Sequence, residues 1–469
     1  MDEIVRRFAQ ARRGAVVAPA GCGKTELIAA AVSGSDRNRA LVLTHTHAGI
    51  HALRKRMQRK HVSSSLYHLE TIAGWALRLV MNFPKRSGVR DNRPRTSTQW
   101  KAVYVGARRA LAVPAIARVV QRSYTCTYID EYQDCVIEQH DLILALAELL
   151  PCRIVGDPLQ GIFGFGGQEI VDWGSDVQQN FDAVGELNQP WRWTNANSDL
   201  GAWTVEVRAA LERGGCIDLR AGPVDWRPKV RQDQLAACRS ALRNRRSTIV
   251  AIDSVAARCH AWARQLPGFT SDEEMEAKDL FDAAREFDRL TGHALAAAVI
   301  RLAKKCHTGV SQQLGTAATA FEEKRLPRIQ RNTKHPETVK ALTALATSGG
   351  RQGLHSALGR IDQLPGCRIF RSEVWREMRS AAKFFESGEA ESLEDAAWRM
   401  RDRTRRKGKK LPRAIVSRTL LVKGMEFDHA LILDASGLAD KENFYVAVTR
   451  ASRSLTIFSD DPVFTFGAS

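Results

Sequence analysis

The chain has 469 residues, of which 44% are hydrophobic, so it is long enough for two or more domains with buried cores. Its formal net charge of +18 favours a polyanionic partner such as nucleic acid, although a basic surface can also serve solubility alone. The nine cysteines include no Cys-x-x-Cys pair, which argues against a zinc site and a disulfide framework. The first residues lack the apolar run of a signal peptide and no segment is long enough to span a membrane, so we expect a cytoplasmic protein with no membrane partner.

The first predicted feature along the chain is a phosphate-binding loop at residues 18–25 (APAGCGKT). A short apolar strand at 15–18 precedes it, and an apolar helical pattern at 26–32 follows. Such a loop needs small residues that let backbone N–H groups converge on phosphate, then a lysine, then a hydroxyl for Mg²⁺. The general pattern has glycine where Ala18 stands, and the alternative is a strand-to-helix turn without a ligand. The residues expected to bind nucleotide are Ala20, Gly21, Cys22, Gly23, Lys24, Thr25 and Glu26, and Thr25 is also expected to bind the metal.

Strands and helices alternate through the rest of the first half. Strands are predicted at 41–44, 126–129 and 152–155, and helices at 47–60, 71–80 and 100–121. A polar stretch at 84–98 interrupts the pattern and is expected to be an insertion loop. The last two strands each end in an acidic turn, at Asp130 and Asp157. This repetition is typical of a parallel sheet with its site at the carboxyl ends of the strands.

Asp130 and Glu131 form a carboxylate pair with separable roles. The first is suited to hold Mg²⁺ through water, and the second to polarise the water that attacks a γ-phosphate. Phosphoryl transfer depends on positioning and charge neutralisation, so cations are expected to reach the phosphate from the opposite side as well. Arg192 and Arg450 are candidates, because a guanidinium bridges phosphate oxygens and keeps its charge.

The second half of the chain predicts another α/β unit, interrupted by a long helical and charged region at 271–410. Strands are predicted at 247–252, 430–433 and 455–458. Residues 292–304 and 372–385 have amphipathic helical spacing. A strongly basic run at 399–410 is either a solvated linker or a loop that contacts DNA.

Six motifs in a fixed order resemble the UvrD/Rep/PcrA group of superfamily 1 DNA helicases over nearly the whole chain. They are residues 18–25, DEYQD at 130–134, GDPLQ at 156–160, PWRW at 190–193, KGMEF at 423–427 and VAVTRA at 446–451. The resemblance implies an α/β fold of two RecA-like parallel-sheet lobes with helical insertions, which bind ATP and Mg²⁺ between them. The expected domains are 1–83 with 125–178 for the first lobe, 84–124 for a short insertion, 179–270 with 411–469 for the second lobe, and 271–410 for a helical, basic insertion domain.

The resemblance also assigns roles at the nucleotide. Gln160 would sense the γ-phosphate, Trp191 would lie against the adenine, and Glu426 would bind the ribose. A family glutamine that reads adenine has no counterpart, because Gln10 lies too close to the loop. The expected catalytic residues are Lys24, Glu131 and Gln160, with Arg192 and Arg450 as arginine fingers.

Four residues are implied to contact single-stranded DNA. They are Thr44, His45, Thr71 and Phe165, the last by stacking on a base. The chain departs from the family pattern near these positions. The family has an aromatic residue where His45 stands and a histidine where Leu420 stands, and Gly166 and Gly167 replace an expected arginine after Phe165.

The expected function is ATP-dependent translocation, or helicase activity, on single-stranded or partly duplex DNA in the 3′ to 5′ direction. The short insertions and the missing arginine support a second hypothesis: a regulatory ATPase subunit that senses nucleotide and DNA ends for a nuclease, with weak or no unwinding. Short UvrD-like proteins partner overcoming-lysogenization-defect-type nucleases in antiviral defence systems such as Gabija, and the chain resembles that size class. A P-loop kinase would not explain the motifs at Gln160, Glu426 and Arg450.

Overall fold

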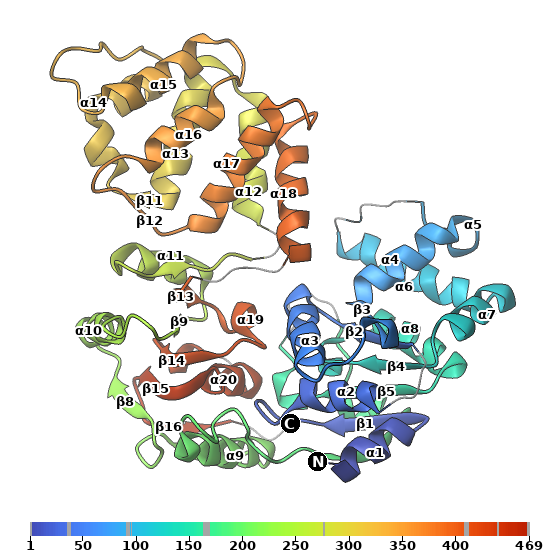
Figure 1. The fold of residues 1–469 in the computed structure, drawn as a ribbon. Coiled ribbons are helices and arrows are strands. Elements are labelled where there is room, and N and C mark those ends of the chain that lie inside the picture. Colours follow the sequence, from blue (N-terminus) through green and yellow to red (C-terminus); the bar gives the residue numbers. More distant parts are fainter. Residues whose placement is uncertain are drawn as a thin grey trace.

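A computed structural model describes residues 2–34, 39–90, 94, 96–162, 169–274, 277–407, 412–438 and 440–466. It contains two α/β lobes and a helical body (Figure 1). The helical body lies against the second lobe, and its last helix reaches the first lobe at helix α3. The expected α/β fold with two parallel-sheet lobes is therefore confirmed. No helix in the described ranges is long and apolar enough to cross a membrane.

The first lobe is built on a six-stranded sheet in the order β3-β2-β4-β5-β1-β6, with every neighbouring pair parallel. Its strands are β1 Arg13–Val17, β2 Ala40–Thr44, β3 Tyr67–Thr71, β4 Cys126–Ile129, β5 Cys152–Gly156 and β6 Asp182–Glu186. The central strands β2, β4 and β5 are buried along their whole length, as continuous apolar runs covered by helices on both faces should be. These three match the predicted strands. The edge strands β3 and β6 were not predicted, because they mix polar and apolar residues.

Eight helices of the described part belong to this lobe. They are α1 Asp2–Gln10, α2 Lys24–Ser33, α3 His47–Arg59, α4 Ile72–Asn82, α5 Pro84–Ser87, α6 Ser97–Leu111, α7 Pro114–Ser123 and α8 Ile137–Leu149, joined by the short helices η1 Ser64–Leu66, η2 Tyr132–Asp134, η3 Pro158–Gln160 and η4 Trp173–Val177. The expected loop at 84–98 begins with α5, and the predicted helical stretch at 100–121 is divided where Pro114 starts a new helix. Helix α6 buries Val103 and Tyr104 in the same core as the sheet. The described helices of this stretch therefore share the core of the first lobe.

The second lobe has a six-stranded parallel sheet in the order β10-β13-β9-β14-β15-β8. Its strands are β8 Asp225–Pro228, β9 Ile249–Ile252, β10 Thr270–Ser271, β13 Ala414–Ser417, β14 Phe427–Ile432 and β15 Ala451–Ser459. Its helices are α9 Ser198–Glu212, α10 Arg231–Ala241, α11 Ala256–Gln265, α19 Thr419–Val422, η5 Ala435–Gly437 and α20 Lys441–Val448, and a small antiparallel pair joins β7 Cys216–Asp218 to β16 Val463–Thr465. The three strands predicted in this half are confirmed.

The expected boundary between the lobes, at residues 178 and 179, needs correction. Strand β6 lies beyond it but pairs with β1, so it completes the first sheet. The chain leaves the first lobe only after Glu186. The sequence did not show this because β6 is an edge strand with two exposed residues at its start and no apolar run.

The helical body is inserted between the neighbouring strands β10 and β13. It contains α12 Lys278–Arg289, α13 Gly292–Cys306, α14 Val310–Glu322, α15 Pro336–Thr347, α16 Leu354–Asp362, α17 Ser372–Glu386 and α18 Leu393–Lys407, with β11 His307–Thr308 paired to β12 Arg368–Ile369. Helices α13 and α17 match the two predicted amphipathic segments. Leu295, Phe287 and Trp375 belong to a core of its own. Much of the basic run at 399–410 lies outside the described side chains, so its two interpretations stay open.

Candidate functional site

The residues of the predicted phosphate-binding loop connect β1 to the N-terminus of α2. Gly21 and Gly23 have φ values of 72° and 98°, a conformation that favours glycine. A Cβ atom at Gly21 would lie 2.7 Å from the ring of Trp193 and 2.9 Å from the Cβ of Arg192. The loop thus requires glycine both for its backbone and for the close approach of the PWRW segment.

Lys24, the first residue of α2, folds back over the loop. Its Nζ donates to the carbonyl oxygen of Ala18 at 3.2 Å and lies 3.7 Å from Oε2 of Glu131. Both contacts hold the ammonium beside the loop. Thr25 is half-buried at the same helix N-terminus. This places a cation, a hydroxyl and a helix N-terminus together, the combination that binds phosphate.

Glu26 was expected to bind nucleotide, but its carboxylate is engaged elsewhere. It forms ion pairs with Arg56 at 2.9 Å and Lys60 at 2.5 Å, both on or next to α3. A side-chain role for Glu26 at the nucleotide therefore finds no support in the geometry. Cys22, in contrast, is buried inside the loop, and its burial raises the pKa of its thiol to about 11, so it stays neutral.

Asp130 and Glu131 lie at the carboxyl end of β4. Glu131 has φ 56° and ψ 44°, and its backbone N–H donates to Oδ1 of Asp130 at 3.0 Å. Burial and the neighbouring carboxylate of Glu131 raise the pKa of Asp130 to about 7. Burial acts in the same direction on Glu131, but the charges of Lys24 and Lys423 outweigh it and lower the pKa of Glu131 to about 2. Glu131 is thus ionised, and Asp130 is a buried carboxylate that a cation would stabilise.

Mg²⁺ fits this donor set. Asp130 is 4% exposed at the carboxyl end of β4, and Thr25 is half-buried at the N-terminus of α2. Carboxylate and hydroxyl oxygens are ligands that Mg²⁺ accepts, usually with water and phosphate oxygens completing its shell. Asp130 and Thr25 are the residues suited to hold it.

A chain of hydrogen bonds extends from Glu131 along the end of the sheet. Gln133 Nε2 donates to Oε2 of Glu131 at 2.6 Å, and Gln133 Oε1 accepts from the backbone N–H of Asp157 at 2.9 Å. The amide of Gln160 donates to Oδ2 of Asp157 at 2.5 Å. Gln160 is 2% exposed, so its amide is fixed by these contacts. The predicted γ-phosphate sensor therefore lies in one network with the predicted base.

Both predicted arginines are bound by acceptors of the second lobe. Arg192 donates from Nε to Oε2 of Glu426 at 3.0 Å and from Nη1 to the carbonyl oxygen of Thr449 at 2.6 Å. The side chain of Arg450 is 1% exposed and donates to the carbonyl oxygens of Val446 and Met425, both at 2.8 Å. Burial and the charge of Arg192 lower the pKa of Arg450 to about 9. The structure brings Arg192, Glu426 and Arg450 together, but with the guanidinium groups turned to protein acceptors.

Lys423 connects the lobes, a role that its motif alone did not predict. Its Nζ contacts the carboxylate of Asp134 and the carbonyl oxygen of Gln160, and the side chains of Lys423 and Asp134 are 4% and 2% exposed. This buried ion pair joins the second lobe to the carboxyl end of the first sheet. Trp191, predicted to lie against adenine, is 53% exposed and available for stacking.

The predicted DNA contacts are only partly placed. Thr44 and Thr71 end the neighbouring strands β2 and β3 in register, so they lie at the same sheet edge as Asp130. The hydroxyl of Thr71 accepts from the N–H of Gly74 at 2.9 Å and caps α4, whereas that of Thr44 is buried without a hydrogen-bond partner in the described ranges. Burial and the charge of Lys423 lower the pKa of His45 to about 3, so its ring is neutral.

Phe165, the predicted base-stacking residue, lies outside the described residues.

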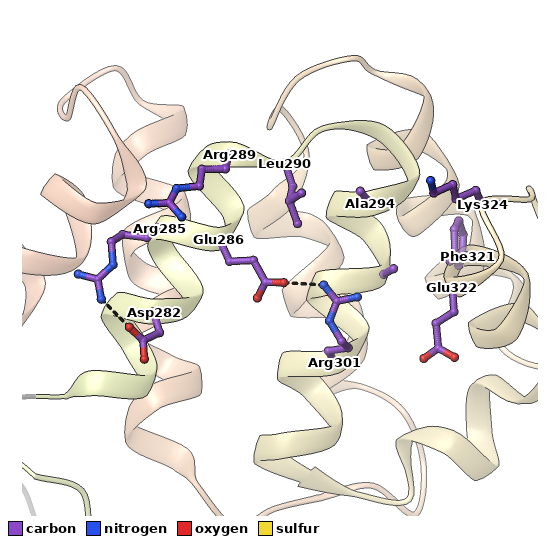
Figure 2. A pocket seen from close by; sticks show the side chains of 11 residues that line it. Asp282, Arg285, Glu286, Arg289, Leu290, Ala294, Arg301, Phe321, Glu322 and Lys324 are labelled. Atoms are coloured by element: carbon purple, nitrogen blue, oxygen red, sulfur yellow. Dashed lines mark hydrogen bonds and ion pairs between the residues drawn. The ribbon is translucent and has the colours of Figure 1, made fainter.

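A cavity of about 460 Å³ far from the loop lies between α12, α13 and the end of α14 (Figure 2). Its lining holds four cations and three carboxylates, and two of the cations are paired: Arg285 with Asp282 at 2.5 Å, and Arg301 with Glu286 at 2.5 Å. It therefore offers no concentrated charge comparable to that of the loop.

The comparisons with known proteins agree with the position of the loop. Residues 1–166 match a family model described as an AAA domain, which covers the strand, the loop and the carboxylate pair. No curated protein matches the chain. Among solved structures, the chain is similar to the crystal structure of Pif1 helicase from Candida albicans, with 9% identity, a TM-score of 0.42, and coverage of 98% of this chain and 94% of that chain.

Proposed function

We propose that the protein is an ATP hydrolase of the superfamily 1 helicase type that couples hydrolysis between its two lobes to movement on nucleic acid. The observation that carries this proposal is the junction at the end of the first sheet. There the phosphate-binding loop, the carboxylates of Asp130 and Glu131, and the buried cation Lys423 of the second lobe meet. The match of residues 1–166 to an AAA domain also supports nucleotide binding.

In this proposal, Lys24 leaves Ala18 and Glu131 to bind phosphate oxygens. Thr25 and Asp130 would hold Mg²⁺, which neutralises phosphate charge when bound. Glu131 accepts a proton from the attacking water, and Gln133 keeps its carboxylate in place. Arg192 and Arg450 would have to exchange their carbonyl acceptors for phosphate oxygens, which requires movement of the second lobe.

Nucleic acid is the proposed partner because of charge and position. The net charge of +18 supports binding to a polyanion. Thr44 and Thr71 lie at the edge of the sheet that carries the nucleotide site, so a strand bound there would sense the state of the same network. We propose single-stranded DNA as the substrate and 3′ to 5′ as the direction, as the resemblance to UvrD-like proteins implies.

The test is ATP hydrolysis by the purified chain with and without a single-stranded oligonucleotide, over a series of salt concentrations. We expect stimulation by the oligonucleotide that declines as salt rises, because phosphate contacts release counterions. Hydrolysis that is indifferent to the oligonucleotide at every salt concentration would contradict the coupling.

A regulatory role is the second candidate, and one observation favours it. The guanidinium groups of Arg192 and Arg450 are both hydrogen-bonded to acceptors of their own lobe, so they would have to change partners before they could contact a nucleotide. A partner such as a nuclease, as in Gabija-type antiviral defence, could respond to that change. This role predicts little hydrolysis by the isolated chain and an increase when the partner is added.

A further inference from the structure

Arg208 is a buried cation in the second lobe that no role described above uses. It lies on α9, whose neighbours Trp203, Val207 and Leu211 belong to the core of the second lobe. The residue is 6% exposed, and its Nη1 lies 2.5 Å from Oδ1 of Asp157, which follows strand β5 of the first lobe. The pair therefore crosses from one lobe to the other.

Asp157 is the centre of the network that holds the catalytic groups. It is fully buried, and Arg208 forms its only ion pair in the described part of the chain. Its other carboxylate oxygen accepts from Gln160, and its backbone N–H donates to Gln133, which in turn donates to Glu131. A continuous series of hydrogen bonds thus joins the guanidinium of the second lobe to the proposed base of the first.

Arg208 and Asp157 differ in the charged partners that each would retain if the lobes separated. Arg208 has a second partner on its own helix, Glu212 at 2.9 Å, which moves with it, whereas Glu186, 4.0 Å from its Nε, belongs to β6 of the first lobe. The Nε atom is buried without a hydrogen bond in the described ranges, and a cavity of about 250 Å³ lies beside the side chain, bounded also by Glu186, Glu212 and Tyr445. Arg208 therefore has room and an alternative acceptor, whereas Asp157 would lose its counter-charge.

We propose that Arg208 is a positioning residue that makes the geometry of Glu131 and Gln160 depend on the position of the second lobe. With the pair formed, Asp157 holds Gln160 through its carboxylate and, through its backbone N–H and Gln133, the carboxylate of Glu131. When α9 moves away, the buried charge of Asp157 is uncompensated and the network loses its anchor. The catalytic consequence rests on the proposed ATP hydrolysis, but the structural link does not.

The first experiment measures that link without any turnover. Arg208→Met keeps much of the side-chain volume and removes the charge, and Arg213→Met, an exposed arginine after the same helix, is the matched control. Hydrogen exchange is followed at residues 129–135 and 156–162 of the first lobe, with global folding checked by circular dichroism. We expect at least tenfold faster exchange in Arg208→Met and wild-type exchange in the control. Unchanged exchange at these segments would overturn the proposal.

The second experiment concerns rate. In oligonucleotide-stimulated hydrolysis, Arg208→Met should lower kcat at least tenfold while KM for ATP stays within threefold of the wild type. Arg208→Lys, which restores a charge opposite Asp157, should recover part of kcat and slow exchange again. If the Met variant does not fold, the Lys variant is compared with the wild type by the same two measurements. A wild-type kcat despite faster exchange would refute control of the catalytic groups. Absence of hydrolysis in the wild type would instead refute the proposed function, while the exchange result still decides the link.

Discussion

Replacing Glu131 by glutamine tests the assignment of the base. The amide of glutamine can still accept the hydrogen bond from Gln133, which in the wild type is 2.6 Å long, so the backbone and the neighbouring network should be retained. It cannot accept a proton from water. A positioned base contributes roughly 10²–10⁴ in rate, which is about 3–5 kcal/mol of activation free energy. We therefore expect kcat to fall by that factor.

Binding of ATP should respond in the opposite direction. Lys24 lies 3.7 Å from the carboxylate of Glu131, and both side chains are largely buried. At an effective dielectric constant of about 20, the Coulomb attraction at this distance is on the order of 4 kcal/mol. Glutamine removes it and leaves Lys24 free for phosphate. Recovery of even a third of this energy corresponds to about tenfold tighter binding.

The assay is steady-state hydrolysis with saturating oligonucleotide, combined with equilibrium titration of a fluorescent ATP analogue. Glu148→Gln, a surface carboxylate of the same lobe with 70% side-chain exposure, is the control and should leave both quantities unchanged. Hydrolysis by Glu131→Gln at more than a tenth of the wild-type rate would show that another group acts as the base. Weaker ATP binding would refute the competition for Lys24.

Two further substitutions test stability. Burial and the charge of Lys423 lower the pKa of His45 from its ordinary 6.5 to about 3. As the pH falls below 6.5, the imidazole therefore takes up a proton in the unfolded chain before it does so in the folded protein. The free energy of unfolding falls by up to about 1.4 kcal/mol per pH unit between pH 6.5 and pH 3. His45→Gln should reduce the drop in melting temperature between pH 7 and pH 5, and an equal drop in His45→Gln and in the exposed control His51→Gln would contradict this. Arg401 is 1% exposed and lies 3.1 Å from Glu377 in the helical body, so Arg401→Met, which removes the buried cation beside this carboxylate, should cost about 3–5 kcal/mol. Urea denaturation should show this loss, whereas the exposed Arg376→Met should stay within about 0.5 kcal/mol, and equal shifts would show that the pair has no special weight.

The features that could be predicted from the sequence are those set by neighbouring residues. The loop at 18–25 could be predicted because a strand, glycines and a helix follow one another directly in the sequence. The central strands could be predicted because each is a continuous apolar run. The edge strands β3 and β6 escaped prediction because half-exposed strands have no such run, and the expected lobe boundary was wrong for the same reason. Amphipathic spacing located α13 and α17 because one face of each must meet a core.

The order of residues along the chain predicts which chemical groups are available for a phosphate site: a lysine, a hydroxyl, two carboxylates and several arginines. Which of these groups lie in contact depends on how the distant parts of the chain pack together. Asp134 and Lys423 are 289 positions apart, and Asp157 and Arg208 are 51 apart, yet each pair is buried at the junction of the lobes. Glu26 turned to α3 because two cations lie there. A buried charge is costly without a counter-charge, and the packing of the lobes determines which counter-charge lies beside it. A local sequence pattern contains no information on that packing.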